Sequence, residues 1–252
     1  MLQNRSKSGI INTLVQVNMQ VVLVTGGSRG IGAAIVRNFA EKKYTVILNY
    51  NKSAEQAKSL RNQLVSEGFD VHLYRADVAD VKQVEDMFLW IRKYFKRLDV
   101  LVNNAGVACY SLCQDVTETD FDEVMNVNAK GTFFCCKHAI PLFLAGESGS
   151  IVNVSSIWGV EGASCESVYA MSKHAIVGLT KSLAKELAFS GINVNCICPS
   201  IVKTDMCKHL SQSEVDDFCR ENDTSVLSVE QLAEDVFRLA TGDSTGVILQ
   251  AR

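Results

Sequence analysis

Tyr169 and Lys173, four residues apart, are the side chains of this sequence best suited to proton transfer. Positions i and i+4 of a helix share a face, so the lysine ammonium can lie beneath the phenol and favour its ionised form. Ser156 lies thirteen residues before Tyr169, at the end of the strand-like residues 151–155. Its hydroxyl can hold a carbonyl or alcohol oxygen against the phenol. The tyrosine and lysine alone also fit a solvated helix surface, so the rest of the chain must decide between the two interpretations.

The segment that follows the first strand-like run is rich in glycine. It reads Thr25-Gly26-Gly27-Ser28-Arg29-Gly30-Ile31-Gly32, follows the β-branched residues 21–24 and opens an amphipathic stretch at residues 31–43. Strand, glycine turn and helix in this order are the context of a dinucleotide site. Because glycine has no Cβ, the backbone can approach a pyrophosphate at the positive end of the helix dipole. A simple chain reversal is the alternative interpretation of this turn.

In order and spacing, these motifs resemble those of the short-chain dehydrogenase/reductases. The resemblance covers about residues 19–252 and rests on the Thr-Gly-x-x-x-Gly-x-Gly turn, on Asn103-Asn104-Ala105-Gly106 after the strand-like residues 98–102, and on Asn128, Ser156, Tyr169 and Lys173. Within the family, the segments Gly-Gly-Ser-Arg-Gly-Ile-Gly, Val-Asn-Val-Ser-Ser and Ile-Asn-Val-Asn-Cys-Ile-Cys-Pro-Ser are most similar to 3-oxoacyl-[acyl-carrier-protein] reductases.

The resemblance implies a role for each residue of the catalytic set. Tyr169 would protonate a carbonyl oxygen, and Ser156 would hydrogen-bond the same oxygen. Lys173 would favour the tyrosinate and contact the nicotinamide ribose, and Asn128 would hold a water in the proton relay.

Two of these assignments have close competitors in the sequence. Asn126 lies two residues before Asn128 and offers the same amide group. Ser155 directly precedes Ser156, but the thirteen-residue interval to Tyr169 matches the family at Ser156.

The charges around the second strand favour NADP(H) over NAD(H). An NAD site usually has an acidic residue about 20 residues after the glycine turn, which a 2′-phosphate would repel, and residues 46–53 contain no acid. Arg29 and Lys52 could face a phosphate instead, with two solvated surface cations as the alternative. With the adenine-side and nicotinamide-side segments that the resemblance implies, the expected cofactor set is Gly26, Ser28, Arg29, Gly30, Ile31, Gly32, Asn49, Lys52, Asp77, Val78, Asn104, Ala105, Gly106, Tyr169, Lys173, Pro199, Ile201 and Thr204.

Composition is consistent with an enzyme of this kind. The 252 residues are 47% hydrophobic, enough for a large core, and the net charge of -3 argues against a nucleic-acid partner. The nine cysteines show neither metal-binding nor disulfide-scaffold spacing, which indicates reduced thiols in a cytoplasmic protein. No apolar run is long enough to span a membrane. His72, His138, His174 and His209 show no metal-binding spacing, so we expect no metal.

Strand-like and helical stretches alternate along the chain. Expected strands lie at residues 21–25, 45–49, 71–75, 100–102, 151–154, 192–197 and 247–249, and helices at about residues 53–67 and 81–95 have plausible starts. Ser53 with Gln56 fits a capping box, and Asp80 can cap the next helix with Gln83 three residues on. Parallel strands need helical crossovers, so we predict a three-layer, doubly wound Rossmann-type α/β fold with a parallel sheet.

The two ends of the chain differ from the family. We expect residues 1–18 to be a loosely held extension before one domain at residues 19–252, with a covering strand or an interface arm as alternatives. The last residues lack the frequent Asp-Gly-Gly ending, which weakens the tetramer that the resemblance implies, although a homo-oligomer, tetramer or dimer, is still expected. Ser200 stands where the family usually has glycine, and residues 205–222 are expected to form a substrate lid.

The sequence therefore predicts an NADPH-dependent oxidoreductase that reduces a ketone to a secondary alcohol. The substrate that the resemblance implies is a 3-oxoacyl thioester of acyl-carrier protein. A sugar, polyol or steroid alcohol dehydrogenase of the same family is an alternative. A protein that senses NADP(H) or acts as a scaffold without turnover is another, although a pure sensor has no need of Ser156, Tyr169 and Lys173.

Overall fold

A computed structural model describes residues 19–202, 204, 211–221 and 224–252. Its centre is a seven-stranded parallel sheet in the order β3-β2-β1-β4-β5-β6-β7. The strands are β1 Val21–Val24, β2 Thr45–Tyr50, β3 Val71–Arg75, β4 Val100–Asn103, β5 Gly149–Val154, β6 Ile192–Pro199 and β7 Ile248–Ala251. The expected extension at residues 1–18 lies outside the described residues.

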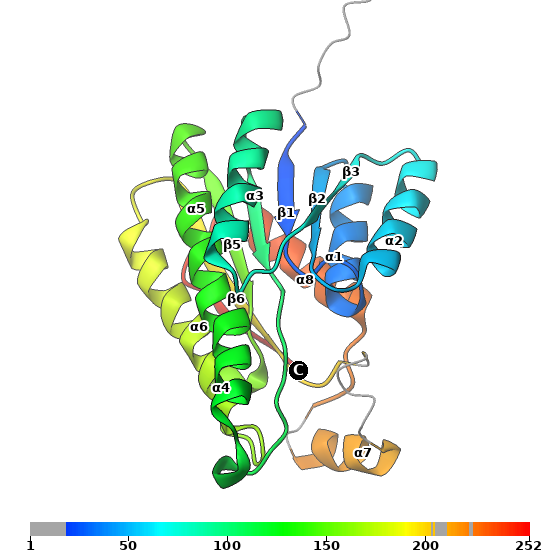
Figure 1. Cartoon of the computed structure of the whole chain (residues 1–252), viewed down its shortest axis with the longest axis vertical. Helices are drawn as coiled ribbons and strands as arrows, with labels where there is room; N and C mark the ends of the chain where they lie inside the picture. Colours follow the sequence, from blue (N-terminus) through cyan, green and yellow to red (C-terminus); the bar gives the residue numbers. More distant parts are fainter. Residues whose placement is uncertain (1–18, 203, 205–210, 222–223) are drawn as a thin grey trace, which may run out of the picture.

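Helices cover both faces of the sheet (Figure 1). Helices α1 (Gly30–Glu41), α2 (Ala54–Ser66) and α8 (Val229–Thr241) pack on one face, and α3 (Val81–Tyr94), α5 (Gly131–Ala145) and α6 (Ser167–Glu186) on the other. The other helices among the described residues are α4 (Glu118–Val124), α7 (Gln212–Glu221), the short helices η1 (Cys113–Asp115) and η3 (Ile157–Gly159), and η2 (Met125–Lys130), a π-helical turn. The predicted three-layer, doubly wound fold is confirmed.

Burial on both faces explains why the strands read as continuous apolar runs. In β1, Val22 and Val24 belong to the core on the α1 side, whereas Val21 and Leu23 belong to the core on the α3 side, and all four are nearly fully buried. Side chains alternate between the faces of a strand, so a parallel sheet with two covered faces needs apolar residues at every position.

The start of α3 matches its expectation and the start of α2 does not. The Asp80 carboxylate accepts hydrogen bonds from the backbone N–H groups of Lys82 and Gln83, as predicted. Ser53 makes no side-chain cap, so the predicted capping box is wrong. An N-cap residue needs an extended backbone to aim its oxygen at the first turn, and Ser53 has φ -88° and ψ 60°.

Strands β2 and β3 lie on one side of β1, and the later strands from β4 to β7 lie on its other side. The sheet therefore has a switch point between β1 and β4. In doubly wound sheets, ligands bind in the crevice outside the carboxyl ends of the strands at such a switch point. At this edge, β1 leads into the glycine turn, β4 into the turn at Asn104, β5 into Ser156 and β6 into residues 200–202. Within the described part of the chain, no helix combines the length and the apolar character needed to cross a bilayer.

Candidate active site

The glycine turn joins β1 to α1 at the switch point. Gly26 and Gly30 have φ of 62° and 53°, a region that other residues rarely adopt. A Cβ on Gly26 would lie 2.9 Å from the Ala105 Cα, and one on Gly32 would overlap the Gly26 carbonyl oxygen. The first turn of α1 contains no acid, so its N–H groups present an uncompensated positive dipole end. This turn therefore fits a pyrophosphate.

The turn after β4 holds the glycine turn in place. The Asn104 side-chain amide donates to the carbonyl oxygens of Thr25 (2.9 Å) and Gly26 (3.0 Å). In return, the Thr25 hydroxyl accepts from the backbone N–H groups of Asn104 (3.0 Å) and Ala105 (3.1 Å). These reciprocal bonds make the two turns one rigid surface, with Gly106 at the end near Asn128 and Lys173.

Three expected adenine-side residues are tied into the sheet edge. Asn49, 1% exposed, accepts from the Gly26 N–H (3.3 Å) and donates to the Ala76 carbonyl (3.1 Å). Asp77 accepts from the Ala79 N–H (3.0 Å), and Val78 is buried against Gly131. Asn49 thus supports the glycine turn from below, a structural role that the sequence pattern does not reveal.

The two cations expected at a 2′-phosphate lie in different settings. Arg29 is the exposed N-cap residue of α1, next to the buried Ser28. The Lys52 side chain is 85% exposed, and its Nζ lies 4.0 Å from Glu123 Oε1 on α4. The backbone therefore places Arg29 at the N-terminus of α1, and Lys52 lies near a carboxylate of α4.

Helix α6 carries Tyr169 and Lys173 into the interior, where they are 8% and 4% exposed. Lys173 Nζ donates to the Val154 carbonyl (3.0 Å) and lies 5.5 Å from the centroid of the Tyr169 ring. Burial lowers the pKa of Lys173 to about 8. The structure thus brings the Lys173 ammonium next to the Tyr169 phenol, in an environment that shields the ammonium from solvent.

Asn128 lies in the π-helical turn η2 and is fully buried. Its amide donates to Ser172 Oγ (2.9 Å), and Ser172 donates to the Tyr169 carbonyl (2.7 Å). A Cβ on Gly106 would lie 3.3 Å from Asn128 Oδ1 and 3.5 Å from Lys173 Nζ. Asn128 therefore lies beside the lysine. Its competitor Asn126 instead accepts a hydrogen bond from Lys130, away from this centre.

The two serines at the end of β5 have different surroundings. Ser155 is 4% exposed and its hydroxyl donates to the Lys173 carbonyl (2.9 Å). Ser156 is half-buried and its oxygen accepts from the Trp158 N–H (3.2 Å). A hydroxyl that accepts still has its hydrogen to donate. Ser156 can therefore donate to a substrate oxygen, while the Ser155 donor is used inside the protein.

Residues after β6 close the other side of the crevice. Thr204 lies beside the glycine turn, since a Cβ on Gly30 would be 3.5 Å from its Cγ2, and Ile201 is buried. Ser200 does not have positive φ, so the position needs no glycine. Its N–H donates to the Ala251 carbonyl (2.9 Å), which continues the pairing with β7 beyond Pro199.

Part of the expected lid, residues 205–210 and 222, lies outside the described residues. Its helical part is α7, which extends from the carboxyl edge of the sheet (Figure 1). Phe218 of α7 packs edge-on against Trp158, with ring centroids 5.6 Å apart. Because Trp158 lies two residues after Ser156, α7 borders the candidate substrate side of the site.

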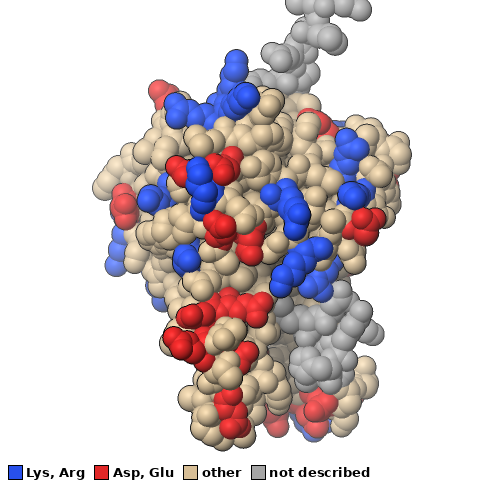
Figure 2. Space-filling view, viewed as in Figure 1, with Lys and Arg blue, Asp and Glu red and all other residues tan. Residues whose placement is uncertain are grey.

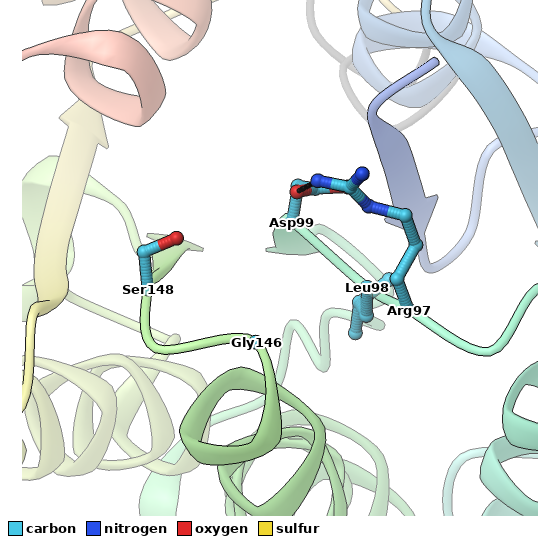
Figure 3. Close-up of a pocket in the computed structure, with 5 residues that line it drawn as sticks. All are labelled: Arg97, Leu98, Asp99, Gly146 and Ser148. Atoms are coloured by element: carbon cyan, nitrogen blue, oxygen red, sulfur yellow. Dashed lines mark hydrogen bonds and ion pairs between the residues drawn. The ribbon is translucent and has the colours of Figure 1, made fainter. Parts of the chain in front are cut away.

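A separate cavity of about 340 Å³ lies at the opposite edge of the sheet (Figure 3). It is lined by Arg97, Leu98, Asp99, Gly146 and Ser148, where the chain enters β4 and β5. Asp99 accepts hydrogen bonds from Arg97 Nε (2.9 Å) and from the Val21 N–H (2.7 Å). This cavity contains none of the residues predicted for catalysis.

A model of the short chain dehydrogenase family matches residues 20–215. The chain therefore belongs to this family of oxidoreductases, and the predicted resemblance is confirmed. It is 37% identical over 233 residues to the 3-oxoacyl-[acyl-carrier-protein] reductase FabG of Staphylococcus aureus strain Mu50, which covers 89% of this chain and 95% of that protein.

Two further relatives match a somewhat shorter part of the chain. The 3-oxoacyl-[acyl-carrier-protein] reductase of Synechocystis is 34% identical over 202 residues, covering 80% of this chain and 82% of that protein. The Escherichia coli K12 oxidoreductase YgfF is 39% identical over 202 residues, covering 78% and 81%. Similarity of this degree extends to relatives with different names, so it defines the family more firmly than the substrate.

Proposed function

We propose that this protein is an NADPH-dependent reductase that converts a ketone to a secondary alcohol. The observation that carries the proposal is the burial of Tyr169 and Lys173 on α6, with Lys173 bonded to Val154 at the end of β5 that leads into Ser156, on the same edge of the sheet as the glycine turn. A bound reduced nicotinamide would supply hydride to the carbonyl carbon. The protein must then stabilise the oxygen as it gains negative charge, and deliver one proton to it.

The residues divide that work by position. Ser156 donates a hydrogen bond to the carbonyl oxygen, and Tyr169 donates the proton to the same oxygen. Lys173, held 5.5 Å from the ring by the Val154 carbonyl, stabilises the phenolate that remains. Asn128 and the Lys173 ammonium both lie close to Gly106. Asn128 would there hold a water that returns a proton to the phenolate.

The preference for the phosphorylated cofactor rests on charge. Strand β2 contains no acid, and Arg29 is the N-cap residue of α1, whose first turn would face the pyrophosphate. A 2′-phosphate would be attracted to the guanidinium and would meet no carboxylate on β2. We expect Arg29→Ala to raise the Kd for NADPH by at least about 10-fold and to change the Kd for NADH by less. Equal losses for both cofactors, measured by fluorescence titration, would contradict this assignment.

The names of the relatives make a 3-oxoacyl thioester of acyl-carrier protein the first substrate to test. The negative charge near the site affects which form of this substrate should be tested. Acidic side chains gather at the α4 end of the molecule, and α4 has Glu118 and Asp120 in its first turn (Figure 2). Acyl carriers bear phosphate groups, which such a rim repels. A neutral, truncated thioester with the same acyl group should therefore be assayed together with the carrier-linked substrate.

The test follows NADPH absorbance with acetoacetyl thioesters, simple ketones, a sugar and a steroid ketone. Oxidation of NADPH with at least one ketone, lost in Tyr169→Phe, is the expected result. Oxidation only of a sugar or steroid substrate would favour the dehydrogenase alternative within the family. Tight binding of NADPH without turnover across the panel would favour a sensor or scaffold, a function for which the intact Ser156, Tyr169 and Lys173 give no reason.

We also propose that the protein acts as a homo-oligomer, a tetramer or dimer, in the cytoplasm. Large apolar side chains on α4 and α5, Phe121, Phe133 and Leu144, are 40%, 48% and 51% exposed, as expected of a subunit interface. The eight cysteines of the described residues form no disulfide, which suits a reducing compartment. Sedimentation equilibrium that finds only monomer at micromolar concentration would overturn the first part.

A further inference from the structure

Helix α7 has no buried side chain to hold it against the rest of the protein. It lies apart from the helices that cover the sheet (Figure 1). Its Phe218 ring packs edge-on against Trp158, with ring centroids 5.6 Å apart. A helix that buries no apolar face is not fixed by a core, because most helical stability in proteins comes from packing such a face. The few bonds at the ends of α7 should therefore decide where it lies.

Two hydroxyl groups tie the end of α7 to the end of β6. The described chain resumes after α7 at Thr224, whose N–H donates to the Cys219 carbonyl in the last turn of α7 (3.0 Å). The Thr224 hydroxyl donates to Ser200 Oγ (3.0 Å), directly after β6. Its other acceptor, the Ser225 carbonyl, is 3.5 Å away, which is long for an O–H donor. The single hydroxyl hydrogen of Thr224 is therefore best used toward Ser200.

The chain that returns from α7 is anchored in the core. The Leu227 N–H donates to the Ile201 carbonyl (2.9 Å), and Leu227 pairs with Val202 in an isolated parallel bridge. Val202 and Leu227 are both buried, in the core on the α1 and α8 side of the sheet. The returning chain thus lies against residues 200–202. The bond between Ser200 and Thr224 is the part of this pairing that lies nearest to α7 along the chain.

The contact between α7 and Trp158 lies beside the candidate substrate position. The Trp158 N–H donates to Ser156 Oγ (3.2 Å), so the ring that Phe218 contacts belongs to a neighbour of the hydroxyl that would hold the carbonyl oxygen. Trp158 and Phe218 are both half-buried, so each keeps some exposed surface. Two aromatic rings in this arrangement offer an apolar surface to the part of a ketone next to its carbonyl group.

We propose that Ser200 and Thr224 are positioning residues for α7. Their hydrogen bond fixes the end of α7 beside the end of β6, and the helix then holds Phe218 against Trp158 as one wall of the ketone site. Because this wall is apolar and would contact the substituent rather than the carbonyl, it favours ketones with an apolar, planar substituent. This selectivity rests on the proposed function, whereas the position of α7 does not.

The first experiment needs neither cofactor nor substrate. The sequence contains two tryptophans, so in a Trp90→Phe background the emission reports Trp158 alone. Quenching of this emission by acrylamide is compared in Ser200→Ala, in Thr224→Val and, as the undocked reference, in Phe218→Ala. Loss of one hydrogen bond shifts the equilibrium between docked and undocked α7 by about 5-fold. We therefore expect quenching in Ser200→Ala and Thr224→Val to rise toward the value of Phe218→Ala.

Thr241→Val is the matched control, because its hydroxyl also makes one hydrogen bond, to the Phe237 carbonyl within α8 (2.9 Å). It should leave the quenching of Trp158 unchanged. The variant that combines Ser200→Ala with Thr224→Val should show no more quenching than either change alone, because both changes remove the same bond. Quenching that stays at the wild-type level in both single variants, or that adds up in the combined variant, overturns the proposal.

The second experiment compares kcat and KM for a small aliphatic ketone and for a ketone with a phenyl substituent. Ser200→Ala and Thr224→Val should raise KM for the phenyl ketone by up to about 5-fold, and should leave its kcat and both constants of the small ketone near those of the wild type. Equal losses of kcat for both ketones would indicate a general structural effect and would contradict the proposal. Absence of turnover with every ketone would overturn the proposed function, and the quenching result would still decide the position of α7.

Discussion

The two edges of the sheet use polar groups in opposite ways. At the amino ends of the strands, Arg97 and the Val21 N–H both donate to Asp99, so the charges beside the cavity satisfy one another (Figure 3). At the carboxyl ends, Lys173 is buried with a backbone carbonyl as its hydrogen-bond partner, and burial lowers its pKa to about 8. A charge buried at such cost indicates a functional role, whereas a paired and hydrogen-bonded carboxylate such as Asp99 needs only a structural one.

This difference shows that a hollow surface and a chemical site are separate findings. The cavity beside Arg97 and Asp99 has volume but no group poised for proton transfer. The carboxyl edge has the donors, the glycine cradle and the perturbed amine. Substitutions at the amino edge should therefore change the free energy of unfolding, and substitutions at the carboxyl edge should change cofactor binding or kcat.

The largest contrast is expected between Tyr169→Phe and Ser148→Ala. Loss of the proton donor lowers kcat by about 10²- to 10⁴-fold, the range for general acid catalysis, while NADPH binding is retained. Ser148→Ala, which lines the amino-edge cavity, keeps wild-type kcat. Steady-state kinetics at saturating NADPH make the comparison, and comparable losses in both variants would erase the distinction between the edges.

Lys173→Met should stabilise the protein without cofactor by about 3 kcal/mol at neutral pH. The folded-state pKa of about 8 lies below the ordinary value of 10.5, so folding disfavours the charged form. Between these pH values the unfolded chain binds more protons, so wild-type stability rises with pH and approaches that of the variant. Denaturant unfolding at pH 7 and at pH 10 measures both. A variant less stable than the wild type at pH 7 would contradict the assigned burial cost.

Gly32→Ala should disturb the carboxyl edge by about 1–3 kcal/mol, because its Cβ would overlap the Gly26 carbonyl oxygen. We expect weaker NADPH binding together with a lower midpoint of thermal unfolding. Gly178→Ala is the matched control, since it lies in α6 with no atom within 4 Å of its added Cβ and should be neutral or slightly stabilising. Unchanged NADPH binding in Gly32→Ala would disprove the close approach of the glycine-turn backbone to the cofactor.

At the amino edge, Asp99→Asn should cost about 1–2 kcal/mol of stability and leave kcat unchanged. The carboxylate accepts from Arg97 and from the Val21 N–H, and an amide oxygen retains only part of that set. Chemical denaturation and steady-state kinetics are measured on the same preparation. A loss of kcat without a loss of stability would show that Asp99 takes part in the reaction, and would contradict the structural role assigned to the amino edge.

The sequence was sufficient for the fold and for much of the placement of the candidate site. Apolar runs separated by helical periods predict a parallel sheet, and the carboxyl ends of its strands must then gather Gly26, Ser156 and Tyr169 at one edge. These predictions depend on periodicity and chain order, which a single sequence contains.

Features that depend on tertiary contacts were not predictable. Nothing in Met125–Lys130 signals a π-helical turn, and the bond from Asn128 to Ser172 joins residues 44 positions apart. Ser53 fits a capping motif, but its backbone angles of φ -88° and ψ 60° are not those of a capping residue. The shared face of Cys196 and Cys198 could be read from the spacing of a strand, but not their packing against Ile176 and Val177 of α6.

The central claim is that Ser156 and Tyr169 act together on one carbonyl oxygen, with Lys173 in support. A double-mutant cycle on kcat tests it directly, with Ser156→Ala, Tyr169→Phe and the combined variant assayed at saturating NADPH. Residues that act as a unit give strongly non-additive losses, so we predict that the combined variant loses little more than Tyr169→Phe alone. Losses that simply multiply would show that the two residues act independently, and would contradict the account.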